Sequence, residues 1–320
     1  MTKLNKTLMA RILAGLLTLG PAWAMAQVSA PTPAPAAEEH EEEGMDGPPV
    51  AISTTAWEHR VRLATDNLNR GITDSLGPGI RLATAFTHQS GLVAELELGS
   101  VSRKIFTNGS GVALTLGGGW RGGNPEGWNY GIGAAYEYFP GTYFDAPLQL
   151  TFDQNTGEPQ PFDFQRTKLD TGYALFELGY GPLRTRLLAV LTKHYRGTNS
   201  GMVCGTLSQG ADPMAGLNCY ANGPRNSRGS LLFDVDYKIP LNGNITTLNL
   251  HAGYQHVRNF SQMNFADIGI GVTHNWQGFE ITAEAAKPFT RNRELFMVMD
   301  GDKVRRIDKP KFVVSVTKRF

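Results

Sequence analysis

The sequence predicts an all-β fold: a twelve-stranded antiparallel up-and-down transmembrane β-barrel with short periplasmic turns and long extracellular loops. From position 57 the chain divides into twelve runs of about ten residues with alternating side-chain character. An even number of such strands is typical of a single-chain bacterial barrel. The last run ends in an aromatic residue, and the connections between runs are alternately short and long.

The last run, 311–320, alternates a mainly apolar face with a mainly polar one, as a strand between lipid and a polar interior does. The apolar face, which we interpret as the signal recognised by the outer-membrane barrel-assembly machinery, consists of Phe312, Val314, Val316 and Phe320. An amphipathic strand of a soluble β-sandwich has the same alternation. The N-terminal sequence and the order of the connections favour the barrel.

Residues 1–26 have the parts of a secretory signal peptide: a basic start, an apolar stretch and the small-residue site Ala24-Met25-Ala26. We therefore expect export to the outer membrane of a Gram-negative cell. Residues 27–56 combine prolines with an acidic run, which predicts a disordered periplasmic tail. No later segment approaches ~18 consecutive apolar residues, so the predicted barrel domain, 57–320, can cross lipid only as strands.

The composition fits this class. Glycine accounts for 37 of the 320 residues and charged residues for 18%, against average usage of roughly 7% and 25%. Glycine-rich strands with few charges suit a wall that faces lipid. The formal net charge of +1 argues against a nucleic-acid partner, which calls for a strongly basic surface.

The connections are sorted by length along the chain. We predict strands at 57–66, 78–88, 91–101, 111–121, 127–139, 168–180, 183–195, 229–239, 245–257, 265–275, 278–288 and 311–320. Short connections at 88–91, 121–127, 181–182, 241–244 and 275–278 alternate with longer ones, notably 140–167, 196–228 and 288–310. This alternation is expected of periplasmic turns and extracellular loops when both ends of the barrel are periplasmic. A soluble sandwich has no reason to sort its connections in this way.

Aromatic residues gather at the predicted strand ends. A periplasmic girdle is expected from Trp57, Trp120, Trp128, Tyr180, Tyr237, Trp276, Phe279 and Phe320, and an outer girdle from Phe106, Tyr138, Phe139, Tyr195 and Phe289.

Cys204 and Cys219 lie in one Gly-, Asn- and Pro-rich stretch of a chain that we expect to be exported. A disulfide between them is the favoured interpretation. The absence of a nearby histidine argues against a zinc site.

Several motifs occur in the order in which one family presents them. They are Asn69-Arg70-Gly71-Ile72-Thr73-Asp74, the segments 86–92, 130–141, 176–183 and 228–286, and the terminal strand. Together they resemble the TorF-type or Gcw_chp family of proteobacterial porins over 57–320. The resemblance implies an outer-membrane barrel and supplies no catalytic or ligand residues. We interpret Arg70 as a structural arginine in a turn, and the acidic tail departs from the family pattern.

The inward phase of each predicted strand supplies candidate pore-lining residues. The candidates are Arg60, Arg62, Arg81, Glu95, Glu97, Glu137, Glu177, Arg186, Asp234, Asp236, Glu280, Glu284, Lys311 and Arg319. Opposed basic and acidic walls that stay apart leave a polar channel, whereas paired charges close the barrel. Glu177 and Arg186 are expected to lie opposite each other. Inward glycines, at 117, 119, 131, 133, 269 and 271, are expected to leave room for water.

We therefore predict a porin-like channel for passive passage of small hydrophilic solutes, with no enzymatic activity, cofactor or metal. A closed structural or surface-interaction barrel is the alternative. An outer-membrane hydrolase is a weaker one, because its candidate bases, His194, His251, His256 and His274, belong to no nucleophile motif. The expected partners are outer-membrane lipid, the barrel-assembly machinery and the solute. The sequence leaves the solute and the oligomeric state open.

Overall fold

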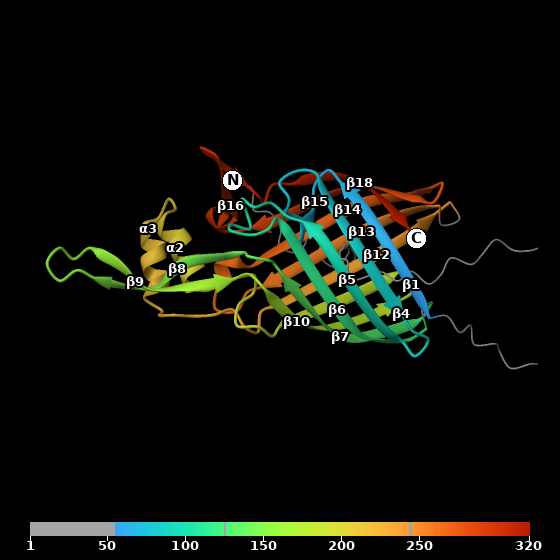
Figure 1. Ribbon diagram of the computed structural model, residues 1–320, viewed down its shortest axis with the longest axis horizontal. Coiled ribbons are helices and arrows are strands. Elements are labelled where there is room, and N and C mark those ends of the chain that lie inside the picture. Colours follow the sequence, from blue (N-terminus) through green and yellow to red (C-terminus); the bar gives the residue numbers. More distant parts are fainter. Residues whose placement is uncertain (1–54, 125, 243–244) are drawn as a thin grey trace, which may run out of the picture.

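The computed structural model describes residues 55–124, 126–242 and 245–320. Within them the chain forms a closed antiparallel barrel of twelve strands (Figure 1). The strands are β1 (Ala56–Ala64), β4 (Gly79–Thr87), β5 (Leu92–Ser100), β6 (Val112–Gly123), β7 (Trp128–Tyr138), β10 (Thr171–Tyr180), β11 (Leu183–Val190), β12 (Leu231–Leu241), β13 (Thr246–His256), β14 (Phe265–Trp276), β15 (Phe279–Thr290) and β18 (Lys311–Arg319). The predicted signal peptide, 1–26, and almost all of the predicted tail, 27–56, lie outside the described residues.

Consecutive barrel strands are neighbours in the sheet, and β18 pairs with β1 to close it. The closing register joins Arg60 to Arg319 and Ala64 to Ser315. Each predicted strand overlaps one observed strand, so the predicted fold class is confirmed. The largest error is at 183–195, where β11 ends at Val190 and the chain leaves the barrel wall.

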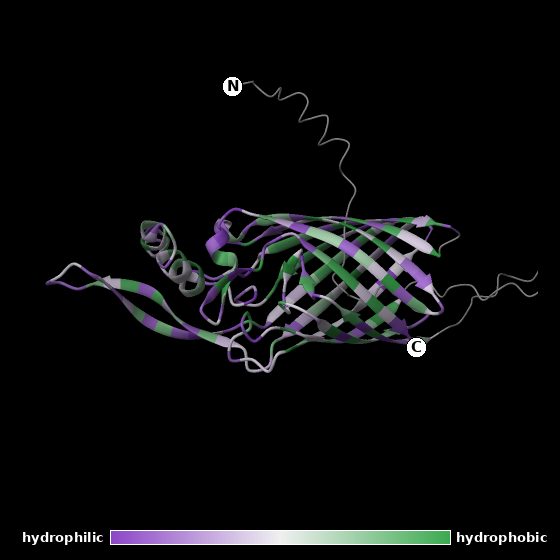
Figure 2. Ribbon diagram, turned by 90° about the horizontal axis from the view of Figure 1, so that it is seen from above, coloured by the Kyte–Doolittle hydropathy of each residue, from purple (hydrophilic) through white to green (hydrophobic). Residues whose placement is uncertain are grey.

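The two faces of the wall differ as the alternation predicts. Outward side chains such as Leu63, Ile132 and Phe312 are exposed over 57%, 65% and 69% of their surface, whereas inward ones such as Glu95 and Val313 are buried. Apolar and polar residues alternate along the strands of the barrel (Figure 2). Because this much exposed apolar surface is unfavourable in water, the outer face is suited to hydrocarbon.

Tight turns join the strands at the end that carries the C-terminus (Figure 1). Gln277 and Gly278 connect β14 to β15 and have φ of 50° and 76°, as the two central residues of a type I′ hairpin turn require. Gly91 has a φ of 88°, and a Cβ there would lie 2.0 Å from the Arg121 carbonyl oxygen. Glycine is therefore required in the turn between β4 and β5.

The long connections at the other end contain structure that the sequence analysis did not predict. The elements are β2 (Leu68–Asn69), β3 (Ile72–Thr73), β8 (Tyr143–Phe152), β9 (Pro159–Lys168), α2 (Ser200–Ser208), α3 (Pro213–Tyr220), η1 (Ser261–Met263), η2 (Arg293–Phe296), β16 (Met297–Asp300) and β17 (Lys303–Arg306). The β8–β9 hairpin projects beyond the barrel, and α2 and α3 lie beside it (Figure 1). The predicted disulfide joins Cys204 of α2 to Cys219 of α3. In the described part of the chain, no helix has the length and apolar character needed to span a membrane.

The aromatic prediction is partly wrong at the outer end. The rings of Phe106 and Phe139 stack 4.7 Å apart, and both residues and Tyr195 are buried. All three residues lie at inward or loop positions. They pack inside the outer mouth, the end of the barrel that carries the long connections, instead of facing lipid. Tyr138 and Phe289 are exposed as predicted. At the other end most of the predicted girdle is exposed, namely Trp57, Trp120, Trp128, Tyr180, Trp276, Phe279 and Phe320.

Candidate functional site

The connection between β1 and β4, residues 65–78, folds into the barrel; we call it the inner loop. Its β2 and β3 form a very short hairpin in which Leu68 pairs with Thr73. Arg70 and Gly71 make the turn and have φ of 51° and 74°, values that match the central residues of a type I′ turn. The turn places the Arg70 side chain at the tip of the inner loop.

Arg70 contacts the barrel wall on the side away from its own strand. Its Nη1 donates to Asp234 Oδ1 at 2.6 Å and its Nη2 to the Phe233 carbonyl at 3.0 Å. Nη2 also lies 3.6 Å from Asp267 Oδ1. The side chains of Arg70, Asp234 and Asp267 are each no more than 1% exposed. A guanidinium and two carboxylates are thus removed from water together, which is tolerable only because they pair.

A glycine in the wall makes room for this contact. A Cβ at Gly253 of β13 would lie 2.6 Å from Arg70 Nη2 and 2.5 Å from Asp267 Oδ1. Any larger residue would displace the guanidinium or the carboxylate. The Nε2 of the neighbouring His251 donates to Asp267 Oδ2 at 2.6 Å, and its Nδ1 lies 3.5 Å from Asp236 Oδ1.

The inner loop is held at further points around the barrel. These contacts are Asp66 Oδ2 with Lys311 Nζ at 2.7 Å, the Leu68 carbonyl with Arg81 Nη2 at 3.1 Å, and Asp74 with Arg196 at 3.4 Å. Between β1 and β12 lie four strands in one direction (β18, β15, β14, β13) and six in the other (β4, β5, β6, β7, β10, β11). Because Arg70 follows β1 and reaches β12, the inner loop crosses the interior.

An apolar core fills the remainder of the outer mouth. Ile72 of the inner loop joins inward residues of the wall and residues of the outer connections, including Tyr173, Val190, Leu232, Phe260, Phe265 and Phe296. Arg196 binds Glu137 at 3.0 Å, and the Tyr173 hydroxyl donates to Glu137 at 2.7 Å. The outer half of the interior is therefore occupied by side chains.

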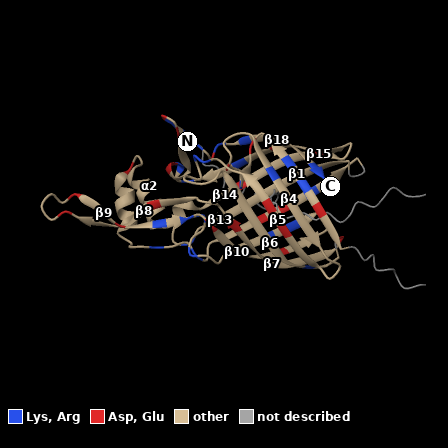
Figure 3. Ribbon diagram, viewed as in Figure 1, with Lys and Arg blue, Asp and Glu red and all other residues tan. Residues whose placement is uncertain are grey.

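The predicted inward charges meet instead of forming separate walls, and basic and acidic residues lie on neighbouring strands of the barrel (Figure 3). The pairs include Arg60 with Glu58 and Glu95, Arg62 with Glu284, Arg81 with Glu97, Arg186 with Asp234, and Arg319 with Glu58 and Glu280. By register, all the predicted pore-lining candidates lie on the inner face.

The inward ion pairs along the barrel are partly shielded from solvent. The side chains of Arg319 and Glu280 are 27% and 29% exposed, those of Arg62 and Glu284 24% and 17%, and those of Arg60 and Glu95 12% and 7%. The paired side chains therefore fill much of the interior between the inner loop and the end with the tight turns.

Glu177 and Arg186 are register partners, as expected, but their side chains have other ion-pair partners. Glu177 binds Arg121 at 3.0 Å and also Arg184, whereas Arg186 binds Asp234 at 3.2 Å. Both residues are nevertheless neutralised inside the barrel.

The inward glycines serve close packing more than hydration. A Cβ at Gly119 would lie 2.2 Å from the Ile132 carbonyl oxygen of the next strand, and one at Gly131 would lie 3.3 Å from Glu177 Oε2. A cavity of about 30 Å³ remains at this glycine-rich wall, which is room for very few water molecules. The charged side chains occupy most of the space that we assigned to water.

The four candidate histidines do not come together. His251 faces the interior, whereas His256 and His274 occupy outward positions of β13 and β14. His274 shares a hydrogen bond with Thr246, and His256 with Asn264. Burial, and then the neighbouring Lys193 ammonium, lower the pKa of His194, which lies beyond β11.

Sequence reasoning missed the partners that complete the site. Asp66, Arg121 and Asp267 occupy inward phases of predicted strands, so the alternation identifies them in principle. Asp74 and Arg196 lie in connections where no periodicity assigns a direction.

The family model described as "Bacterial protein of unknown function (Gcw_chp)" matches residues 50–320. The chain belongs to the Gcw_chp family. The resemblance noted from its motifs is thereby confirmed, and the barrel described above is the fold of this Gcw_chp protein.

Solved structures with a similar fold are outer-membrane barrels. The KdgM porin in complex with disordered oligogalacturonate has 8% identity and a TM-score of 0.38, with 82% of this chain and 98% of that one covered. An outer membrane channel from Pseudomonas putida F1 has 10% identity and a TM-score of 0.37 (86% and 100% covered). Outer membrane phospholipase A from Escherichia coli has 10% identity and a TM-score of 0.34 (83% and 96% covered). Because these sequence identities and TM-scores are low, the similarities assign no function to this chain. Among curated proteins, no sequence matches this chain.

Proposed function

We propose that this barrel is a porin-type channel for small hydrophilic solutes, and that the conformation described here is its closed state. The inner loop is the closing element, and Arg70 is its anchor. In this proposal the paired charges of the barrel interior line the path that a solute takes when the inner loop moves aside.

The observation that carries the proposal is the identity of the closing element. It is an inserted loop and not a wall strand, and it is held largely by side-chain ion pairs and hydrogen bonds at separate points. Such contacts can be broken without opening the hydrogen-bonded ladder of the barrel. The inner face beneath the loop is also lined by charged side chains, which a barrel that only anchors a surface structure does not need.

Arg70→Ala tests the anchor. Removing one partner of a buried ion pair costs about 3–5 kcal/mol, and this cost falls on the closed conformation. Single-channel recording in planar bilayers should therefore show a larger fraction of time in the conducting state than for the wild type. Arg166→Ala is the matched control, because Arg166 lies on β9 with 63% of its side chain exposed. Equal open fractions for Arg70→Ala and the control would contradict the proposal.

A surface-interaction barrel is the second candidate, supported by the outer elements. A cavity of about 510 Å³ lies between the β8–β9 hairpin and the helices, and Phe144, Leu150, Met202 and Tyr220 are among its lining residues. If neither the wild type nor any inner-loop variant conducts, a surface-interaction barrel replaces the channel as the proposed function.

A further inference from the structure

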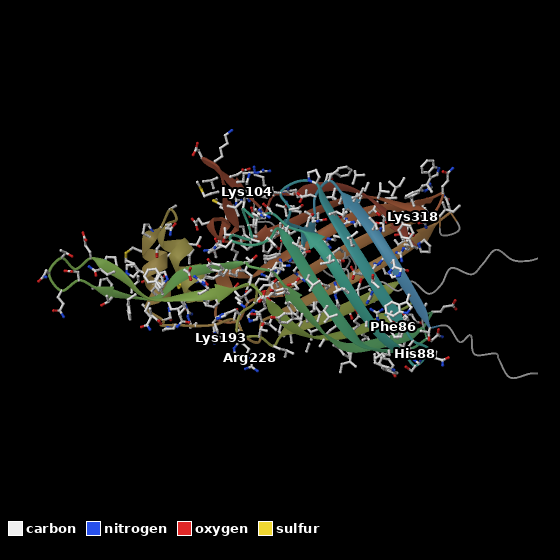
Figure 4. The ribbon with its side chains drawn as sticks, in the orientation of Figure 1. Phe86, His88, Lys104, Lys193, Arg228 and Lys318 are labelled. Atoms are coloured by element: carbon white, nitrogen blue, oxygen red, sulfur yellow. A yellow bond between two sulfur atoms is a disulfide. The ribbon has the colours of Figure 1, made fainter. Side chains whose placement is uncertain are left out.

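Three cations gather at the outer ends of β11, β12 and β13. Lys193 follows the end of β11, Arg228 precedes β12 and Arg258 follows β13; we call them the outer basic cluster. The Gly229 amide donates to the Val190 carbonyl at 2.9 Å and the Arg258 amide to Ser230 Oγ at 3.0 Å. These bonds bring the three segments together, and Figure 4 labels Lys193 and Arg228 at this end of the barrel.

The outer basic cluster differs from the cations inside the barrel. All three side chains are exposed, and a Cβ on Gly229 would lie 3.1 Å from Arg258 Nη1, so Arg258 lies over the segment that carries Arg228. Among the ion pairs of the described residues, none involves Lys193, Arg228 or Arg258. Like charges brought close together repel, and an anion between them would relieve the repulsion.

The cluster borders the apolar band of the same three strands. Outward residues next to it on the strand ends are Leu191, Leu231, Phe233 and Tyr254, exposed over 52%, 41%, 44% and 47% of their surface. A basic cluster directly beyond a lipid-facing band lies at the depth of lipid headgroups. Two of its members are arginines, whose planar guanidinium groups match phosphate oxygens in pairs.

We propose that the outer basic cluster binds the phosphate groups of a phosphorylated glycolipid of the outer leaflet. Its acyl chains pack on the apolar side chains of β11 to β13, and its phosphates lie among Lys193, Arg228 and Arg258. This site is on the outside of the barrel and does not depend on the proposed transport function.

The test uses the folded full chain in detergent, titrated with bisphosphorylated lipid A and followed by native mass spectrometry. The test variant is Lys193→Gln/Arg228→Gln/Arg258→Gln. The matched control, Lys303→Gln/Arg305→Gln/Lys309→Gln, removes the same charge from exposed positions on β17 and the segment after it. Heat-dependent migration on gels checks that both variants are folded barrels.

We expect the wild type and the control to bind alike and the test variant to bind about a hundredfold more weakly, because each basic side chain at a lipid surface contributes about a fivefold factor. Monophosphorylated lipid A should bind the wild type more weakly than the bisphosphorylated form, and added salt should reduce this difference. Equal binding by the test variant and the wild type would overturn the proposal. The proposal would also be overturned if the wild type bound a phosphate-free glycolipid with the same acyl chains as tightly as it binds bisphosphorylated lipid A.

Discussion

Arg70 keeps a backbone conformation that its own sequence does not favour. A non-glycine residue with a φ of 51° costs about 1–3 kcal/mol. Each hydrogen bond to a charged partner returns about 1.5–3 kcal/mol, and Arg70 makes one to the Asp234 carboxylate and a second, through the same guanidinium, to a carbonyl. The turn therefore depends on the opposite wall of the barrel, which is why a local motif is tied to a distant strand.

Arg62 and Arg81 are the residues that we expect to set ion preference once the inner loop is removed. They are register partners and have ion-pair partners at 3.6 Å and 3.5 Å, Glu284 and Glu97. Arg62→Glu/Arg81→Glu replaces two cations beside two carboxylates with a patch of like charge. The background for this test lacks the tip of the inner loop. We expect the cation-to-anion permeability ratio, obtained from the reversal potential in a KCl gradient, to rise several-fold.

The control for this prediction is Arg166→Glu/Lys168→Glu in the same background, which makes the same charge change on β9 outside the barrel. A reversal potential that stays unchanged after Arg62→Glu/Arg81→Glu would show that these arginines do not line the conducting path.

At the scale of elements, the strands of the wall were predictable and the outer structure was not. A strand such as β18 carries its assignment in its own alternation, because one face meets lipid and the other the interior. The inner loop has no such pattern, and its direction is set by a contact between residues 164 positions apart. Phe106, Phe139 and Tyr195 were misplaced for the same reason, since an aromatic at a strand end suits either a lipid interface or a packed mouth.

The charges of the wall illustrate the same limit. Alternation assigned Arg60 and Glu95 correctly to the inner face. It did not indicate whether they meet, because that depends on the diameter of the barrel and on what the inner loop displaces. The short helices α2 and α3 were missed because each is below ten residues and depends on the disulfide and on packing against β8.

The Cys204–Cys219 disulfide should stabilise α2 and α3 without affecting the barrel. Its loop spans 15 residues, for which the loop-entropy model gives about 3 kcal/mol. Cys204→Ser/Cys219→Ser should therefore expose 200–220 to a protease added from outside, while heat-dependent migration of the barrel stays unchanged. The double alanine variant Met202→Ala/Met214→Ala serves as a control that keeps the disulfide. Equal protease resistance in the presence and absence of the disulfide would contradict this role.

For the whole molecule, the apolar surface and the charged interior are two consequences of one alternation. The outer face presents residues such as Ile132 and Phe312 to lipid, and the inner face holds ion pairs. The wall by itself is a cylinder of twelve strands, intermediate in size between the side-chain-filled small barrels and the open 16-stranded porins. The inner loop and the apolar core that Ile72 joins occupy its outer half.

The most direct test of this account is liposome swelling with sugars of graded size after deletion of residues 68–73. Ala64 and Gly79 are register partners, so the shortened connection still joins β1 to β4. Deletion of residues 154–158, at the tip of the β8–β9 hairpin, is the control. We predict that the inner-loop deletion admits small sugars and excludes larger ones, while the wild type and the control swell slowly. Equal swelling rates for all three proteins would contradict the claim that the inner loop closes the barrel.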